Sequence, residues 1–240
     1  MNESLPLLVK DENGVRHLIL NRPTKLNAID YAQHLRLFSE FKSAATDDSV
    51  RVVALSGMGR GFSAGDDLSA EPFQGDDPFS DRKVNLEIGS GPAILLESCK
   101  CLRNLPKPTV ALMHGVALGS GYDYSLSCDF RLATKDIRYG DPRIDRALWA
   151  AEGWSFKLPR LANLSLVSRI AYLGEEMDGD KALQFGLVSE ILSGDPDIRT
   201  SAQGFLNRLV SVAGDVYARN KEALLNSLDM NYEHAIKQQI

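Results

Sequence analysis

Cysteine is scarce in this chain, which has three cysteines in 240 residues. Cys99 and Cys101 are separated by one residue and Cys128 stands apart, a spacing that excludes a disulfide framework. No histidine lies near enough in sequence to complete a metal site with them, so we expect no bound metal. Reduced thiols are typical of the cytoplasm, and we expect a cytoplasmic protein.

Long apolar runs and an excess of positive charge are also absent. No apolar run approaches the roughly 20 residues that a membrane-spanning helix needs. Residues 1–6 lack the basic and apolar segments of a secretory signal, so we expect none. The formal net charge of −5 gives no general attraction to nucleic acid or to an anionic membrane, and we expect neither as a partner.

The residues that are present indicate a globular α/β protein, with 44% hydrophobic and 25% charged residues. The start of the chain predicts a hairpin, because strands over 7–9 and 15–20 flank the tight-turn pair Asn13-Gly14. The hydrophobic pattern predicts further strands over 51–56, 109–113, 130–133, 138–139 and 188–192. It predicts helices over 31–46 (capped by Asn27 or Asp30), 84–104, 119–127, 153–162, 165–173, 178–185, 196–213 and 214–235.

Two glycine-bearing stretches, Gly61–Leu68 and Ala117–Asp123, each follow a predicted buried strand. Small residues after a strand let the backbone turn with its N–H groups pointing outward. Two such turns side by side would offer two donors to one oxygen, which is the chemistry of an oxyanion hole. The carboxylate of Asp123 would then lie three residues beyond one donor.

Several segments, in order and at the usual intervals, resemble the crotonase (enoyl-CoA hydratase/isomerase) superfamily. They are residues 21–28, 62–68, 115–121, 128–129, 139–142, 158–161 and 182–188. The resemblance implies a spiral of repeated ββα units over residues 1–190 that carries an acyl-CoA site. It further implies a C-terminal helical trimerisation region over 191–240, and a homotrimer or a dimer of trimers.

By that resemblance the substrate is an acyl-CoA thioester. Coenzyme A enters as part of the substrate, and no other cofactor is expected. The superfamily's two oxyanion N–H donors map onto Asp66 and Ser120, where they would stabilise a thioester enolate. Its contacts with coenzyme A and substrate map onto Lys25, Leu26, Ala28, Ala64, Asp67 and Leu68. For Lys25 the alternative is a lysine that is simply exposed to solvent.

The hydratases of this superfamily use two glutamates, which map onto Asp123 and Arg143. Asp123 would act as a base if burial raised its pKa; the alternative is an aspartate that only complements a helix dipole. Arg143 departs from the pattern, because arginine stays protonated and cannot act as a base. It would either pair with Asp123 or bind an acidic group of the acyl chain.

Two further acids are candidates for proton transfer. Asp145 lies two residues beyond Arg143. Glu152 is next to the position where dienoyl-CoA isomerases of the superfamily place a second acid, and those isomerases also carry aspartate at the position of Asp123. Both Asp145 and Glu152 are equally compatible with exposed helix positions.

Two other features admit both a functional and a structural interpretation, and a third has a structural interpretation alone. Trp149 and Trp154 replace a glycine-rich turn of the superfamily and would either line the acyl pocket or fill an ordinary core. Residues 69–90 mix turn-forming and charged residues and would form a lid over the substrate or a plain linker. His114 has no nucleophile near it in sequence, and we interpret it as a structural imidazole.

The whole sequence predicts an enzyme, a lyase or an isomerase, that forms a thioester enolate and hydrates or shifts a C=C bond. The alternative is a non-catalytic acyl-CoA-binding or regulatory protein that has lost the second acid. A contact of Arg143 with Asp123 within hydrogen-bond distance would favour that alternative. A serine hydrolase is not supported because there is no Gly-x-Ser-x-Gly elbow, nor is a nucleotide-binding protein, because Gly119-Ser120-Gly121 lacks the later glycine.

Overall fold

The computed structural model describes residues 5–70, 93–149, 153–195, 197–227 and 229–237. The chain begins with the predicted hairpin, in which β1 (Leu7–Glu12) pairs antiparallel with β2 (Val15–Leu20). Asn13 and Gly14 both take a positive φ, 51° and 79°, as a two-residue turn between twisted strands requires. The hairpin prediction is therefore confirmed.

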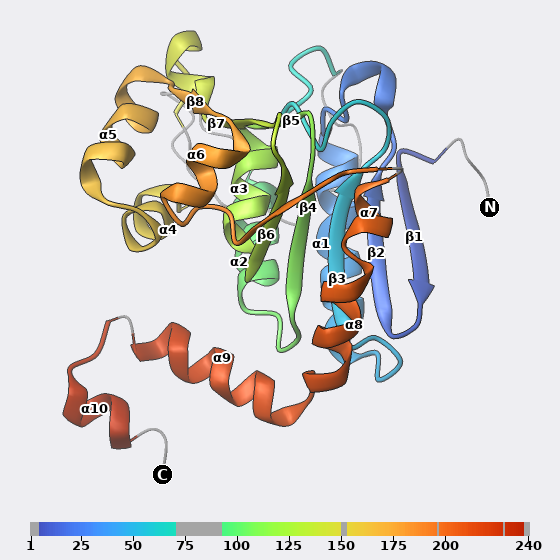
Figure 1. Ribbon diagram of the computed structural model, residues 1–240, viewed down its shortest axis with the longest axis vertical. Helices are drawn as coiled ribbons and strands as arrows, with labels where there is room; N and C mark the ends of the chain where they lie inside the picture. The colour runs from blue at the N-terminus through green and yellow to red at the C-terminus, as the bar shows by residue number, and fades with distance from the viewer. Residues whose placement is uncertain (1–4, 71–92, 150–152, 196, 228, 238–240) are drawn as a thin grey trace.

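The hairpin forms one edge of a six-stranded sheet in the order β1-β2-β3-β4-β6-β9 (Figure 1). From β2 onward the pairings along this sheet are parallel. The added strands are β3 (Val52–Gly57), β4 (Thr109–Met113), β6 (Phe130–Thr134) and β9 (Glu190–Leu192). Every residue of β3 is buried, as expected of a parallel strand that is covered on both faces.

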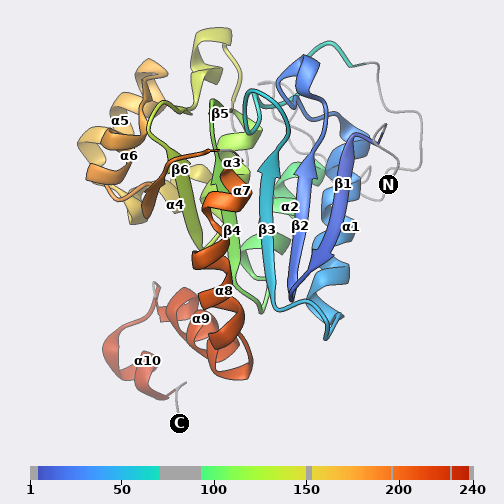
Figure 2. The same cartoon turned by 45° about the vertical axis from the view of Figure 1, so that its right-hand side comes forward.

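Helices cover the two faces of this sheet (Figure 2). On one face α1 (Tyr31–Thr46) and α2 (Ala93–Arg103) pack in a core that includes Val53 and Leu55 of β3. On the other face α7 (Ile198–Ser201) and α8 (Gln203–Val212) share a core with Val52 and Ala54. Successive residues of β3 serve both cores because side chains of a strand alternate between its faces.

α1 begins and ends where the sequence predicts, and its capping explains the start. The Asp30 carboxylate accepts from the Gln33 N–H, and the Gln33 side chain accepts from the Asp30 N–H, which together form a capping box. Asn27, the alternative cap, instead donates to the carbonyl oxygens of Met58 and Gly61. It therefore fastens the segment before α1 to the first glycine loop.

A second, smaller sheet carries the second glycine loop. In it β5 (Val116–Leu118) pairs parallel with β7 (Arg138–Gly140), which pairs antiparallel with β8 (Glu176–Met177). The sequence predicts a turn at β5 and no strand at β8, because runs of three and two residues are too short to show a period. α3 (Ser120–Ser127) follows β5 directly, with Gly119 as its N-cap.

The remaining elements are mostly helical, as predicted. They are η1 (Pro23–Lys25), η3 (Pro142–Arg146), α4 (Trp154–Leu161), α5 (Leu164–Leu173), α6 (Gly179–Gln184), α9 (Asp215–Ser227) and α10 (Tyr232–Lys237). Two predicted helices are each divided: 196–213 becomes α7 and α8, and 214–235 becomes α9 and α10. The helix predicted over 84–104 is confirmed from Ala93 onward, and its start lies outside the described residues.

The α/β core with a helical C-terminal region is thus confirmed, whereas the boundary between residues 190 and 191 stays a prediction. The three cysteines are free thiols. Among the described residues, no helix combines the length and apolar character needed to cross a membrane.

Candidate active site

The two glycine loops touch each other. Ser63 of the first loop forms an isolated parallel bridge with Ala117 of β5. Gly65 has a φ of +100°, and a Cβ added to it would lie 3.0 Å from the Leu118 carbonyl oxygen and 3.3 Å from the Ser120 nitrogen. A side chain at this position would force the loops apart, so glycine is what allows their approach.

Both predicted oxyanion donors have a free N–H group within the part of the chain that the structure describes. Ile29 forms a bridge with Asp66, but it uses the Gly65 carbonyl and the Asp67 N–H and leaves the Asp66 N–H unused. Ser120 is the first residue of α3, where a backbone N–H has no partner within its own helix. The helix dipole adds positive potential at this end.

Asp123 lies in the first turn of α3 and is fully buried. Arg143 Nη2 lies 2.7 Å from Asp123 Oδ2. The contact is an ion pair between a buried carboxylate and a largely buried guanidinium. Of the two alternatives for Arg143, pairing with Asp123 is therefore the one that the structure contains.

The guanidinium of Arg143 also binds a second carboxylate. Its Nε and Nη2 donate to the two oxygens of Asp141, each at 2.7 Å. Burial raises the pKa of Asp123, and the positive charges of Arg143 and Lys157 oppose that rise only in part. Asp123 therefore shares the charge of Arg143 with Asp141, and the negative charge of Asp141 also raises the pKa of Asp123.

Lys157 is a buried cation that the sequence analysis missed. Its Nζ donates to Ser127 Oγ at 2.9 Å and to the Asp123 carbonyl oxygen at 3.5 Å. It extends from α4 beneath the C-terminal end of α3, where carbonyl groups favour a positive charge. Lys157 directly precedes the Leu158–Leu161 segment that carried the resemblance, but nothing in its neighbours indicates burial.

His34 is a second site residue that the sequence analysis missed. It belongs to the buried face of α1 with Leu37 and Phe41. Its Nε2 lies 3.0 Å from Asp66 Oδ1, and its Nδ1 lies 2.8 Å from Tyr124 Oη. Helical spacing places residue 34 on the face of 37 and 41, so periodicity was the signal that could have revealed it.

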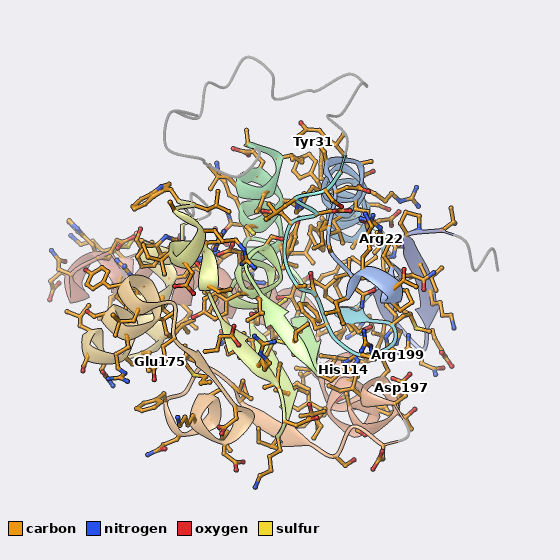
Figure 3. The ribbon with its side chains drawn as sticks, turned by 90° about the horizontal axis from the view of Figure 1, so that it is seen from above. Arg22, Tyr31, His114, Glu175, Asp197 and Arg199 are labelled. Atoms are coloured by element: carbon orange, nitrogen blue, oxygen red, sulfur yellow. The ribbon has the colours of Figure 1, made fainter. Side chains whose placement is uncertain are left out.

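The segments predicted to bind coenzyme A lie together beside the first glycine loop. The Ala64 N–H donates to the Leu26 carbonyl at 2.9 Å, which joins them directly. Lys25 Nζ donates to Asp67 Oδ2 at 2.9 Å. Arg22, which is labelled in Figure 3, donates to the same oxygen through Nη2 at 2.6 Å. Hydrogen bonds from Ser69 and Lys25 hold the pKa of Asp67 well below its ordinary value. Ala28 accepts from Arg22 through its carbonyl, and Leu68 is 70% exposed.

A mostly apolar cavity of about 310 Å³ lies beside Arg143. Trp149 and Trp154 both line it, with their rings in edge-to-face contact at 6.4 Å between centroids. Tyr122 lines it as well, and its buried hydroxyl has no hydrogen-bond partner in the described part of the chain. The aromatic pair therefore faces a cavity, which agrees with the pocket interpretation of the tryptophans.

The remaining residues singled out in the sequence either lie away from Asp123 or are not among the residues that the structure describes. Asp145 is exposed on η3, and its carboxylate lies against Gly174 at the end of α5. His114 Nε2 lies 2.9 Å from the Gly59 carbonyl oxygen, near Asp197 and Arg199 (Figure 3). Glu152 and residues 71–90 of the 69–90 segment lie outside the described residues. Their predicted roles stay predictions.

Comparison with solved structures places the fold. PA4980 of Pseudomonas aeruginosa matches with a TM-score of 0.86 and 29% identity, covering 100% of this chain and 99% of that chain. The fold and the paired glycine loops define an α/β protein of the crotonase superfamily. The chain belongs to the enoyl-CoA hydratase/isomerase family, whose model matches residues 10–240.

Characterised relatives include both isomerases and hydratases. The 1,2-epoxyphenylacetyl-CoA isomerase of Escherichia coli is 29% identical over 83% of this chain and 74% of its own length. The 2,3-dehydroadipyl-CoA hydratase of the same organism is 30% identical over 82% of this chain and 73% of its own length. The family and the fold expected from the sequence are thus confirmed.

Proposed function

We propose that this chain is an acyl-CoA isomerase that shifts a C=C bond with one carboxylate, Asp123. The observation that carries the proposal is a buried Asp123 in the helix that begins at Ser120, with Arg143 at the second acidic position. Hydration of a double bond needs a group that activates water and another that delivers a proton. A double-bond shift needs only one group that removes and returns the same proton.

The reaction balances with the residues present. For a 3-enoyl-CoA, the Asp123 carboxylate takes a proton from C2, the electron pair of that C–H bond forms a C1=C2 double bond, and the π pair of the C1=O group moves onto the carbonyl oxygen. The enolate is conjugated with the C3=C4 double bond. The N–H groups of Asp66 and Ser120 stabilise the resulting enolate. Protonated Asp123 returns the proton to C4 while the double bond forms between C2 and C3. The product is a 2-enoyl-CoA, and Asp123 is again a carboxylate.

Two features of the site suit this role for Asp123. Burial raises its pKa, and a higher pKa makes a carboxylate a stronger base toward an α-proton. The adjacent guanidinium of Arg143 opposes full protonation, so the basic form is retained. Arg143 is itself held by Asp141, which limits how far it neutralises Asp123.

The cavity beside Arg143 is the proposed acyl site. Its size, its apolar lining and its two tryptophans suit a short planar acyl group, which would lie against an aromatic face. The E. coli relative is named for an epoxyphenylacetyl thioester, whose acyl group is aromatic. Coenzyme A would extend past Lys25, Leu26, Ala28, Ala64, Asp67 and Leu68, and the assembly would be a homotrimer or a dimer of trimers.

The test compares isomerisation of 3-hexenoyl-CoA with hydration of crotonyl-CoA. We expect the wild type to favour isomerisation and Asp123→Asn to lower its kcat by roughly 10²–10⁴-fold, the contribution of a general base. Asp136→Asn, on an exposed aspartate outside the site, is the matched control and is expected to be neutral. Glu152→Gln and Asp145→Asn examine the other two acids, and an unchanged rate in Asp123→Asn would remove Asp123 from the mechanism.

The Arg143–Asp123 ion pair favours a second candidate, a non-catalytic acyl-CoA-binding protein. In that case the pair is a structural element that keeps Asp123 from accepting a proton. Saturable binding of crotonyl-CoA and 3-hexenoyl-CoA, with no turnover of either by the wild type, would support this candidate over the isomerase.

A further inference from the structure

One imidazole connects both halves of the candidate oxyanion hole. His34 is 1% exposed and lies in α1, outside both glycine loops. Through Nε2 it reaches Asp66 in the first loop at 3.0 Å. Through Nδ1 it reaches Tyr124 at 2.8 Å, on the helix that the second loop opens.

The two partners of His34 lie next to the groups that would form and stabilise the enolate. Asp66 supplies one of the two free N–H groups, so a restraint on its side chain also restrains the peptide that carries this N–H. Tyr124 directly follows Asp123 and lies one turn after Ser120, the other donor. His34 thus contacts one residue from each half of the site.

The chain of contacts continues to a third helix. The rings of His34 and Tyr124 stack with centroids 5.8 Å apart and planes at 25°. Tyr124 Oη lies 3.1 Å from Ser98 Oγ on α2. Asp66 and Tyr124 would each lose the contact with His34 if the imidazole moved, which is costly for the buried Tyr124 hydroxyl.

The direction of the bond to Asp66 follows from its charge. Burial raises the pKa of the Asp66 carboxyl, but His34, with smaller contributions from Ser120 and Arg143, outweighs this effect and leaves the pKa below its ordinary value. An ionised carboxylate has no proton to donate, so the N–H at Nε2 of His34 is the donor. A charge-assisted hydrogen bond of this kind is stronger and more directional than a neutral one.

We propose that His34 is a positioning residue that holds the Asp66 N–H in register with the Ser120 N–H, so that both meet one thioester oxygen. The proposal rests on the enolate-stabilising function proposed above. His34 does not touch the substrate, because its imidazole is buried and both of its nitrogens face protein groups. Its effect on the reaction passes through Asp66.

Three substitutions at residue 34 separate its two contacts. His34→Leu removes both. In His34→Gln the amide nitrogen falls near the place of Nε2 and keeps a donor for Asp66, whereas in His34→Asn the amide falls near the place of Nδ1 and keeps only the Tyr124 contact. We expect kcat to fall about 10–100-fold in His34→Leu and His34→Asn, less than the loss of a whole donor, with recovery to within about 5-fold in His34→Gln.

Two further measurements distinguish positioning from a loss of folding. KM is expected to change by less than about 3-fold, since the donors act on the enolate rather than on coenzyme A. The absorbance of bound cinnamoyl-CoA is expected to shift to the red in the wild type and in His34→Gln, because a polarised carbonyl draws charge from the conjugated acyl group. The shift is expected to shrink in His34→Leu and His34→Asn. His114→Gln, which alters a histidine outside this network, is the control for both signals.

The outcomes separate this proposal from the isomerase proposal. If the wild type shows the red shift without isomerase activity, and the shift depends on residue 34, the isomerase proposal fails and the positioning role stands. If His34→Leu folds and retains both the shift and kcat, the positioning role fails alone. If His34→Leu does not fold, the comparison of His34→Gln with His34→Asn decides, and equal kcat values in that pair overturn the proposal. A wild type that neither turns over 3-hexenoyl-CoA nor shifts the absorbance of cinnamoyl-CoA overturns both. If it turns over 3-hexenoyl-CoA without a cinnamoyl-CoA shift, the isomerase proposal stands and the kcat values of His34→Gln and His34→Asn decide the positioning role.

Discussion

Asp123 is a carboxylate whose environment acts on it in opposite directions. Complete burial favours its neutral form, whereas Arg143 at 2.7 Å and the more distant Lys157 favour its charged form. Arg143 is held by Asp141 through two hydrogen bonds and would stay in place if Asp123 were protonated. Burial therefore has the largest effect on the pKa of Asp123, and Arg143 is the charged group that opposes it most.

Replacing Arg143 is expected to change the pH at which the enzyme works. Arg143→Met removes a cation that favours the carboxylate, so the pKa of Asp123 rises further and the basic form is lost at a higher pH. The acid limb of the kcat profile is expected to move toward higher pH by about 1–3 units, the usual effect of a neighbouring arginine. Arg143→Lys retains the charge and is the control. A limb that stays fixed in Arg143→Met would mean that another group titrates.

The sequence identified most of these residues but could not decide their pairing. Two alternatives stayed open for Arg143, because its contact with Asp123 joins the segment after β7 to α3. Residues so far apart in sequence leave no local pattern that predicts their contact. His34 was missed for a related reason, since its partners are 32 and 90 residues away. Glycine spacing after a strand is a local signal that indicated the two loops, whereas Asp66 and Ser120 were assigned as donors by the resemblance to the superfamily.

The two glycine loops form one unit because their backbones meet without side chains between them. A Cβ at Gly121 would lie 2.8 Å from the Ser63 Cβ, just as one at Gly65 would meet Leu118 and Ser120. The Ser63 hydroxyl accepts from the Gly65 N–H and donates to the Asn27 carbonyl, which fixes the first loop from its other side. The spacing of the two donors is therefore determined by packing as well as by hydrogen bonds.

Gly65→Ala is expected to separate the loops. The positive φ of Gly65 and the 3.0 Å approach to the Leu118 carbonyl both oppose a side chain, and the free energy of unfolding is expected to fall by about 1–3 kcal/mol. Gly204→Ala in α8 is the matched control, since nothing lies within 4 Å of its Cβ, and it is expected to stabilise by about 0.4–1 kcal/mol. Denaturant unfolding measures both. A Gly65→Ala protein as stable and active as the wild type would contradict the packing argument.

Helices were predicted accurately where a capping residue is followed by a long stretch with helical spacing of its hydrophobic residues. α1 has both, through Asp30, Gln33 and its buried stripe, and its bounds were found to the residue. β5 and β8 have neither, since three- and two-residue strands gain their order from neighbours in space. The break at Ala202 between α7 and α8 was missed because alanine is compatible with a continuous helix.

At the scale of the whole molecule, the C-terminal helices differ in how they join the core. α8 buries Leu206 and Leu209 against the sheet. In α9 the buried residue is Lys221, and a cavity of about 510 Å³ lies between this helix and the core. Val216 and Leu224 of α9 are exposed, which leaves apolar surface available for the trimer contact predicted for residues 191–240.

α9 is therefore held to the core by a polar cluster at Asp129. Lys221 Nζ and Tyr217 Oη donate to Asp129 Oδ2 at 2.8 and 3.1 Å, and the same oxygen accepts from the Thr109 N–H at the start of β4. Lys221→Met removes a charged hydrogen bond worth about 1.5–3 kcal/mol and replaces it with an apolar chain. The expected result is easier local opening of α9 and little change in the sheet.

Amide hydrogen exchange of Lys221→Met measures this directly. Protection over residues 215–227 is expected to fall by roughly 10–100-fold, the equivalent of that hydrogen bond, while β3 and β4 keep theirs. Lys135→Met is the control, because the Lys135–Asp180 pair is 77% and 55% exposed and its loss is expected to be nearly neutral. Equal loss of protection in α9 and in the sheet would show that the two unfold together. Unchanged protection in α9 would show instead that contacts other than Asp129 hold it, and a concentration-dependent protection would assign those contacts to a second copy of the chain.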